Sequence, residues 1–478
     1  MDMANKNSIK GDEKSKRRAF GTHMTSIDIF MEFIYPEVKE KLKDYIWVDL
    51  YAGEGNLILP LLNNIDTEER EDFFRNHIFL FDIQKKMVKN CISNATRYGI
   101  SESIARSNIQ VRDSLESFPN FLKMLNKPVY HITNPPYLYL GYISKHESTK
   151  NLLRYFKKKN SGYQDLYQIA MMNDLRNDLK NLIYIIPTNF LYGASVSNKF
   201  RTNFLKYYNI WKMIIFETKM FRFTGTNISI GFFQRKSNPQ HDINAFNGIK
   251  IFPNGESSER RYVLEPKFKY RAGSEFITFL KKFKATKPLK VSYYLLAEEV
   301  NKNLGENEVT LLDANKYNNG NYKRLKCNVN ENLYKKINAN ILYVRTLDTG
   351  SNDGRVGLNI IEEDFNVNGI LVSGNTYRTH PIHIFLTPEI PIEKQILLKK
   401  YFNFLLEAFR AKLDSEFLTT YKYSNASYTR KYLGLNQVRK LIETFPFNMN
   451  EIEKLELNKI IDDNQFPETL NFLEKLRF

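Results

Sequence analysis

A run of four residues, Asn134, Pro135, Pro136 and Tyr137, combines hydrogen-bond acceptors with a stiff backbone. It follows an apolar segment, and its two prolines fix the direction of the asparagine side chain and of the neighbouring carbonyl. The Asn134 side-chain oxygen and the Pro135 carbonyl can together accept both hydrogens of a planar amino group. Such bonds favour a pyramidal nitrogen and free its lone pair, so the motif predicts an amino nitrogen activated for group transfer. Tyr137 adds a flat face on which an unstacked base can lie.

Three aspartates precede this run, and each follows a segment that we expect to be a strand. Asp49 opens the segment 49–56, whose glycines allow a tight turn to pass close to a ligand. Asp82 ends the second expected strand, where an acid binds ribose hydroxyls, and Asp113 ends the third. Each acid alone is compatible with a solvated cap at a strand end. The three together predict an adenosyl pocket.

An alternation of strands and helices must position these residues. Apolar, β-branched or aromatic runs predict strands at residues 45–50, 77–81, 108–112, 128–133, 181–186, 210–217 and 227–234. Helices are expected at residues 26–34, 165–179 and 199–208, among others. This alternation predicts a mainly parallel, doubly wound sheet whose ligands lie beyond the carboxyl ends of its strands.

Chain length and a change of pattern predict three parts. At 478 residues the chain is long enough to bury two cores. Residues 1–19 form an expected basic flexible arm, residues 20–240 the α/β domain, and residues 241–478 a C-terminal α+β domain. The boundary is expected between Lys236 and Phe252. Short strands are predicted in the second domain at 341–345, 369–373 and 383–386, and the sequence from Pro391 onward is largely helical in pattern.

Charge and composition narrow the class of protein. The formal net charge is +17, which indicates an extended polyanionic partner but does not separate DNA from RNA. No apolar run is long enough to span a membrane and no secretory signal is recognisable, so a cytoplasmic protein is expected. The two cysteines, Cys91 and Cys327, lack ligand-spaced partners, which argues against a disulfide frame or a metal centre.

Over residues 20–236 the order of these motifs resembles that of gamma-type adenine-N6 DNA methyltransferases of bacterial restriction-modification systems. Residues 21–26 are similar to the family's N-terminal cofactor motif, although the family usually has Thr-Pro where this chain has Thr25-Ser26. Asp165-Leu166-Tyr167 resembles a later motif that helps to shape the target pocket. The resemblance implies a Rossmann-like class I methyltransferase sheet with helices on both faces. It also implies transfer of a methyl group from S-adenosylmethionine to an adenine flipped out of duplex DNA.

The resemblance also implies roles for individual residues. The residues implied to bind the cofactor are Thr25, Asp49, Ala52, Gly53, Gly55, Asp82, Ile83, Asp113 and Asn134. Among them, Asp82 would hold the ribose, Ile83 the adenine face and Asp113 the adenine amino group. The implied catalytic residues are Asn134, Pro135, Pro136, Tyr137 and Phe221, with Phe223 as the alternative to Phe221 for stacking on the flipped base.

The C-terminal half would then recognise the DNA target. Aromatic and cationic residues alternate near residues 421–432, as on a surface that grips phosphates. In the C-terminal half as a whole, the residues expected to bind DNA are Arg345, Arg355, Tyr428, Arg430 and Lys431. The expected partners are double-stranded DNA and a cognate restriction endonuclease, and a monomer is favoured.

Two other functions are compatible with the same residues. A methyltransferase acting on a protein glutamine or on RNA faces the same lone-pair problem at a planar nitrogen, and the same loop can serve it. A DNA-binding specificity subunit without activity would retain the fold but not the chemistry. The cofactor motif before Asp49 and the long basic C-terminal half favour the DNA enzyme over the first alternative. The intact run from Asn134 to Tyr137 argues against the second.

Overall fold

The computed structural model describes residues 25–193, 195–217, 220, 227–252, 254–348, 354–376, 379–413, 417–420 and 430–476. These residues divide into two compact units, of which the N-terminal unit extends to Ala272 and the C-terminal unit begins at Gly273. The two units are described separately below. The expected basic arm, residues 1–19, lies outside the described residues.

Nine strands of the N-terminal unit form one mixed sheet among the described residues, in the order β3-β2-β1-β4-β5-β7-β6-β8-β9. The strands are β1 (Ile46–Asp49), β2 (Ile78–Asp82), β3 (Ile109–Val111), β4 (Val129–Thr133), β5 (Asn181–Pro187), β6 (Tyr208–Phe216), β7 (Ile228–Arg235), β8 (Asn244–Ile251) and β9 (Ser257–Leu264). Strands β1 to β5 are parallel, whereas β7 is antiparallel to both β5 and β6. The chain order reverses between β1 and β4, and ligands of doubly wound sheets bind at such a switch point.

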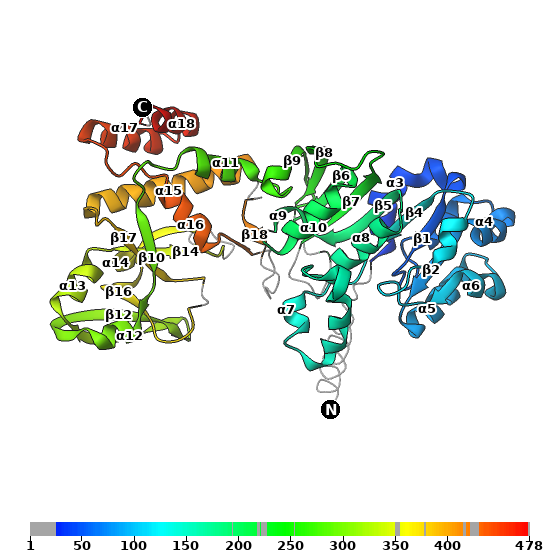
Figure 1. Ribbon diagram of the computed structural model, residues 1–478, viewed down its shortest axis with the longest axis horizontal. Helices are drawn as coiled ribbons and strands as arrows, with labels where there is room; N and C mark the ends of the chain where they lie inside the picture. The colour runs from blue at the N-terminus through cyan, green and yellow to red at the C-terminus, as the bar shows by residue number, and fades with distance from the viewer. Residues whose placement is uncertain are drawn as a thin grey trace. The chain divides into compact units, whose positions relative to one another are not determined.

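Helices and short helical turns connect these strands (Figure 1). Before β4 they are α2 (Ile27–Ile29), η1 (Phe30–Ile34), α3 (Tyr35–Val38), η2 (Lys39–Asp44), η3 (Leu59–Asn64), η4 (Thr67–Glu69), α4 (Arg70–His77), α5 (Lys85–Arg97), α6 (Glu102–Asn108) and η5 (Asn120–Met124). After β4 they are α7 (Leu140–Ile143), η6 (Glu147–Phe156), η7 (Lys158–Asn160), α8 (Leu166–Arg176), α9 (Asn189–Tyr192), α10 (Ser195–Leu205) and η8 (Pro266–Phe268).

Burial explains why the strands and helices form where the sequence predicts them. All residues of β1 and β4 are buried, as expected for central parallel strands with both faces covered. In α5 the buried residues Val88, Cys91, Ile92 and Ala95 recur with helical spacing and face the sheet. The predicted Rossmann-like sheet is thereby confirmed, and each of the seven predicted strands is found within about three residues of its expected ends.

The sheet continues beyond the expected domain boundary. Strand β8 pairs in parallel with β6, and β9 pairs antiparallel with β8, so the segment 244–264 belongs to the N-terminal unit. In β8 buried residues alternate with more exposed ones, as on a strand with one covered face. The boundary expected between Lys236 and Phe252 therefore lies inside this sheet, and the compact unit ends at Ala272.

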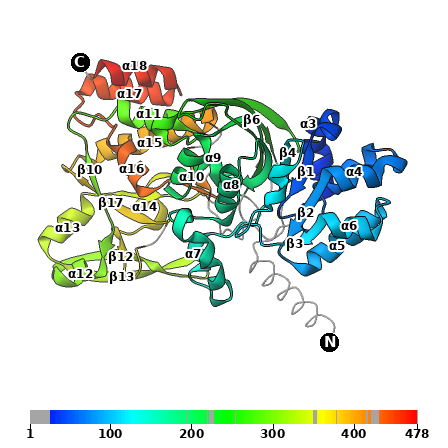
Figure 2. The same cartoon turned by 45° about the vertical axis from the view of Figure 1, so that its right-hand side comes forward.

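The C-terminal unit combines two four-stranded sheets with helices, in agreement with the predicted α+β class (Figure 2). Its strands are β10 (Lys290–Tyr293), β11 (Leu295–Leu296), β12 (Leu304–Asn318), β13 (Asn321–Val329), β14 (Leu342–Arg345), β15 (Gly357–Ile360), β16 (Gly369–Val372), β17 (Ile382–Thr387), β18 (Thr419–Thr420) and β19 (Lys431–Tyr432). Its helices are α11 (Ser274–Lys282), α12 (Ala297–Lys302), α13 (Glu331–Asn338), α14 (Ile361–Phe365), α15 (Ile392–Leu413), α16 (Leu435–Ile442), α17 (Glu451–Asp462) and α18 (Phe466–Lys475). Its four-stranded sheets have the orders β10-β17-β14-β15 and β11-β16-β12-β13, and β18 pairs with β19 in a two-stranded sheet.

Two properties of the described residues bear on the function. No helix in the described ranges is both long enough and apolar enough to cross a membrane. Nor do the described side chains contain a group of three or more His, Cys, Asp or Glu residues arranged to hold a metal ion.

Candidate functional site

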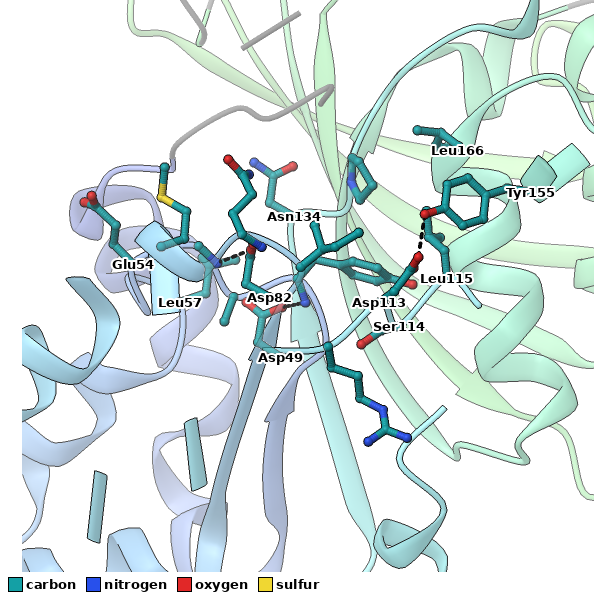
Figure 3. Close-up of a pocket in the computed structure, with 18 of the residues that line it drawn as sticks. Asp49, Glu54, Leu57, Asp82, Asp113, Ser114, Leu115, Asn134, Tyr155 and Leu166 are labelled. Atoms are coloured by element: carbon teal, nitrogen blue, oxygen red, sulfur yellow. Dashed lines mark hydrogen bonds between the residues drawn. The ribbon is translucent and has the colours of Figure 1, made fainter. Parts of the chain in front are cut away.

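A pocket with an empty volume of about 1080 Å³ lies in the N-terminal unit, at the carboxyl ends of β1, β2 and β4 (Figure 3). Its lining includes most of the predicted cofactor residues, namely Thr25, Asp49, Ala52, Gly53, Asp82, Ile83, Asp113 and Asn134. These residues span more than 100 positions of the sequence. The fold thus brings the predicted set together at the switch point of the sheet.

Asp49, the last residue of β1, anchors the floor of the pocket. Its Oδ1 accepts hydrogen bonds from the backbone N–H of Tyr51 (2.9 Å) and from the Thr133 hydroxyl (2.6 Å). Only 1% of Asp49 is exposed. Burial raises the pKa of Asp49 to about 7, against the lowering effect of the two hydrogen bonds. A carboxyl group with this pKa changes charge near neutral pH.

The turn after Asp49 is tied to the end of β2. Gly53 donates its backbone N–H to Asp82 Oδ2 (3.0 Å), and Gln84 donates its own to Asp82 Oδ1 (2.8 Å). Burial raises the pKa of Asp82, while these two backbone hydrogen bonds lower it. Gly55 has a φ of +86°, and a Cβ built there would lie 2.6 Å from Leu59 Cδ1. A glycine is therefore required at position 55, which is buried and does not line the pocket.

Asp113 lies two residues beyond the end of β3, because that strand ends at Val111 rather than at the aspartate. Its Oδ2 accepts a hydrogen bond from the Tyr155 hydroxyl (2.6 Å) and another from Arg154 Nη2 (3.0 Å). Tyr155 and Arg154 belong to η6, a segment inserted between β4 and α8, and both line the pocket. The sequence reasoning missed them because no local pattern marks them.

Asn134 lies at the carboxyl end of β4 and lines the pocket. Its Nδ2 donates to Thr25 Oγ1 (2.8 Å), and Tyr137 directs its hydroxyl at Asn134 Oδ1. The Thr25 carbonyl in turn accepts a hydrogen bond from Asn56 in the turn after β1 (2.8 Å). Thr25 therefore links the turn after β1 to Asn134, and its role in cofactor binding stays a prediction.

The backbone that leaves the motif is also fixed. Leu138 donates its N–H to Asp165 Oδ1 (2.9 Å), and Leu166 donates its own to the Leu138 carbonyl (3.3 Å). Leu166 also lines the pocket beside Pro136. The predicted motif at residues 165–167 thus holds the exit of the loop in place.

Tyr137 is buried and lies outside the lining of the pocket. Its side chain is 8% exposed and does not line the pocket, and its hydroxyl is also 2.8 Å from the Ile185 carbonyl oxygen. Burial raises the pKa of Tyr137 well above its usual value, so the hydroxyl stays protonated and donates. Pro135 is likewise buried. Stacking of a base on Tyr137 stays a prediction.

A buried network supports the turn from below. His131 Nε2 accepts the backbone N–H of Leu50 (3.2 Å), so the ring proton is on Nδ1, which donates to Asp174 Oδ2 (2.6 Å). The Tyr184 hydroxyl donates to the same oxygen (2.5 Å). All three side chains are fully buried. This network joins β4, α8 and β5 to the residue that follows Asp49.

Two polar atoms in the pocket wall fit a ligand that carries hydroxyl and amino groups. The Tyr51 hydroxyl and Ser114 Oγ are buried and make no hydrogen bond to the described residues. Both residues line the pocket together with the three aspartates. Because buried polar atoms are normally hydrogen-bonded, these two atoms and the acids suit a ligand with a mixed polar and apolar surface.

The residues predicted to stack on the flipped base or to bind DNA are placed only in part. Phe221, Phe223 and Tyr428 lie outside the described residues. The ends of β14 and β19 are neighbours, since Asp348 donates its N–H to the Lys431 carbonyl and Leu433 donates to that of Thr346, each at 2.9 Å.

Two of the three arginines predicted to bind DNA, Arg345 and Arg355, already have side-chain partners. Arg345 Nη2 lies 3.1 Å from His380 Nε2, and Arg355 forms an ion pair with Glu407. The ends of β14 and β19 thus bring Arg345 and Lys431 to the same side of the C-terminal unit. Arg355 is instead paired with Glu407. DNA contacts at all five predicted positions stay predictions.

Comparison with known proteins identifies the family. Residues 15–326 match the family described as N-6 DNA Methylase. Because this match covers more than half of the chain, the protein belongs to the N-6 DNA methylase family. No curated protein matches the chain.

Several solved structures resemble this chain at low sequence identity. The type IIL restriction-modification enzyme MmeI, solved in complex with DNA, is 12% identical with a TM-score of 0.53, and the match covers 93% of this chain and 71% of that chain. The type IIG restriction endonuclease BpuSI is 11% identical, with a TM-score of 0.47 and coverage of 95% and 62%. The type I restriction enzyme EcoKI M protein is 11% identical, with a TM-score of 0.38 and coverage of 64% and 63%. This chain spans 32% to 62% of the length of the first structures that it matches.

Proposed function

We propose that this protein is a site-specific DNA methyltransferase that transfers a methyl group from S-adenosylmethionine to the N6 amino group of adenine. The observation that carries the proposal is the position of Asn134 on the rim of a pocket that Asp49, Asp82 and Asp113 also line. Membership of the N-6 DNA methylase family supports it. The likeness to the type IIL restriction-modification enzyme MmeI supports a role as the modification enzyme of such a system.

The pocket residues would hold the cofactor by its different parts. Bound S-adenosylmethionine supplies an electrophilic methyl group on a sulfonium. Asp49 and the turn 52–55 would hold the methionine part, Asp82 the ribose hydroxyls, and Ile83 and Asp113 the adenine ring. The half-exposed Ile83 side chain offers an apolar surface for that ring.

Asn134 and Pro135 would activate the target amino group. The exocyclic nitrogen of adenine is a poor nucleophile because its lone pair is delocalised into the ring. Two acceptors, Asn134 Oδ1 and the Pro135 carbonyl, would take its two hydrogens and favour the pyramidal form. An amide oxygen has two lone pairs, so Asn134 Oδ1 can accept from Tyr137 and from the substrate together.

The C-terminal unit would recognise the DNA sequence around the target base. Its cations include Arg430 and Lys431, near the end of β14. Cations of this kind grip phosphates without reading sequence. Double-stranded DNA is the proposed partner, together with a companion endonuclease, and we propose that the methyltransferase acts as a monomer.

The test is methyl transfer from labelled S-adenosylmethionine to DNA, tRNA or a release factor in parallel reactions. The proposal expects label in DNA alone, recovered as N6-methyldeoxyadenosine after digestion to nucleosides. Label in tRNA or in a glutamine side chain would replace the proposed substrate. Binding of DNA without labelling of any acceptor would instead indicate a specificity subunit.

A further inference from the structure

We propose that Tyr155 and Arg154 are positioning residues that turn Asp113 into an acceptor for the exocyclic amino group of the donor's nucleobase. On this account the pair selects adenine over a 6-oxopurine in the cofactor pocket. The inference rests on the proposed function, because it takes a nucleoside-linked methyl donor as the ligand. It adds two residues that neither the sequence motifs nor the family match assign.

The geometry of the cluster, which we call the Asp113 clasp, consists of three side chains. Tyr155 donates its hydroxyl proton to Asp113 Oδ2 (2.6 Å), as Figure 3 shows. Arg154 Nη2 donates to the same carboxylate oxygen (3.0 Å) and to the Tyr155 hydroxyl oxygen (2.8 Å). The Arg154 guanidinium also lies 4.7 Å from the centroid of the Tyr155 ring, and its Nε is 3.9 Å from Glu116.

Both donors of the Asp113 clasp donate hydrogen bonds to the same carboxylate oxygen. Within the described part of the chain, Asp113 Oδ2 receives both side-chain hydrogen bonds and Oδ1 receives none. Asp113 lines the pocket, so Oδ1 is the oxygen that can serve a ligand. A carboxylate held in this way offers acceptor lone pairs only.

The Tyr155 hydroxyl can act only as a donor toward the carboxylate. Burial raises the pKa of Tyr155, and its hydrogen bond to Asp113 raises the pKa further, so the proton stays on the tyrosine. The ring is 5% exposed and packs in the core of the N-terminal unit. Neighbouring buried residues of η6, including Leu152 and Phe156, hold the segment in place.

This arrangement separates two classes of purine. The amino group of adenine donates a hydrogen bond to a fixed acceptor. The carbonyl of a 6-oxopurine would instead bring a second acceptor toward the Asp113 carboxylate, which is unfavourable in a partly buried site. A site built around one hydrogen bond rejects an analogue that lacks the donor far more strongly than an apolar pocket rejects an extra methyl group.

The experiment measures binding of two ligands by calorimetry, S-adenosylhomocysteine and its inosyl analogue S-inosylhomocysteine. In the analogue a 6-carbonyl and a protonated N1 replace the 6-amino group and the unprotonated N1 of adenine. We expect the full-length protein to prefer the adenosyl ligand by about a hundredfold. Tyr155→Phe keeps the ring but removes the donor. It should weaken adenosyl binding by about tenfold and leave inosyl binding nearly unchanged, as expected for one hydrogen bond to a charged group.

Two further variants make the result decisive. Tyr163→Phe is the matched control, because the buried Tyr163 hydroxyl accepts from Asn203 and the residue does not line the pocket. The preference of Tyr163→Phe for the adenosyl over the inosyl ligand should equal that of the parent protein. Arg154→Met alters a side chain that is 48% exposed, so it tests the clasp even if Tyr155→Phe folds poorly, and it should lower the preference about threefold.

The outcomes distinguish the two levels of the proposal. A preference that is unchanged in Arg154→Met and in folded Tyr155→Phe overturns the role of the clasp while leaving the cofactor assignment intact. Failure of the parent protein to bind either ligand removes the cofactor assignment, and the clasp's role with it.

Discussion

Asn134 Nδ2 donates a hydrogen bond to Thr25 Oγ1 across 2.8 Å, although 109 positions separate the two residues in the sequence. The contact decides which end of the amide faces the threonine. With the NH₂ group held by Thr25, the amide oxygen is left for Tyr137 and for the substrate. The turn after β1, which Asn56 links to the Thr25 carbonyl, and the proposed catalytic amide are therefore connected by hydrogen bonds.

Thr25→Val should impair turnover through this contact. Valine keeps the shape of threonine but removes the acceptor, so the Asn134 amide can rotate. We expect kcat to fall about tenfold, the effect of about one hydrogen bond. Thr25→Ser keeps the hydroxyl and should restore most of the rate in steady-state methylation assays. Equal rates for the valine and serine variants would show that the hydroxyl does not orient the amide.

Tyr137→Phe separates two roles of this tyrosine. The ring is retained, whereas the hydroxyl that contacts Asn134 Oδ1 and the Ile185 carbonyl is lost. We expect a severalfold loss of kcat without weaker cofactor binding, because only the orientation of the amide is disturbed. Tyr137→Ala should additionally weaken capture of the flipped base, measured by the fluorescence of 2-aminopurine at the target position. If Tyr137→Phe methylates DNA at the parent rate, the Tyr137 hydroxyl does not orient the amide, and only the ring contributes.

Gly55→Ala should destabilise the N-terminal unit more than Gly99→Ala does. The two glycines have nearly equal φ values, +86° and +89°, so the backbone strain of an alanine is matched. Only at position 55 would the new Cβ lie 2.6 Å from Leu59 and 2.8 Å from Cys91. We expect an extra loss of about 1–3 kcal/mol from overpacking, measured by chemical denaturation. If both variants lose the same free energy of unfolding, the added Cβ at position 55 is accommodated without extra destabilisation.

Asp49 predicts a pH dependence of stability. Its pKa rises on folding from 3.8 to about 7, so the folded state binds the proton more tightly than the unfolded chain does. Its contribution to stability is complete below about pH 4 and is lost as the pH rises toward 7, by roughly 4 kcal/mol at most. Asp49→Asn keeps the Oδ1 acceptor for Tyr51 and Thr133 but does not titrate. The free energy of unfolding of Asp49→Asn should therefore fall less than that of the parent between pH 4 and pH 7. Identical pH profiles of the two proteins would contradict the raised pKa of Asp49.

Much of the fold could be predicted because its central strands are continuous apolar runs with both faces covered. The positions of Asp49, Asp82 and Asn134 follow directly, since each stands at or just after the end of such a strand. Strands β8 and β9 were missed, because they lie at the edge of the sheet and their residues alternate between buried and more exposed. For the hairpin of β12 and β13 a signal was available in Asn319-Gly320, where both residues have positive φ.

The rest of the site depends on contacts that no local pattern encodes. Tyr155 reaches Asp113 across 42 positions, and His131 reaches the backbone of Leu50 across 81. Neither side chain stands in a recognisable motif or at a strand end. Tyr137 shows the converse: its position was predicted from a motif, but its burial follows from packing in the hydrophobic core of the N-terminal unit.

The most direct test compares Asn134→Ala with the parent protein in two assays, calorimetric binding of S-adenosylhomocysteine and formation of N6-methyldeoxyadenosine in duplex DNA. The account predicts binding within a fewfold of the parent and a loss of turnover of at least about a hundredfold, the effect of removing one acceptor that acts in the transition state. Methylation at the parent rate by Asn134→Ala would contradict the proposed chemistry.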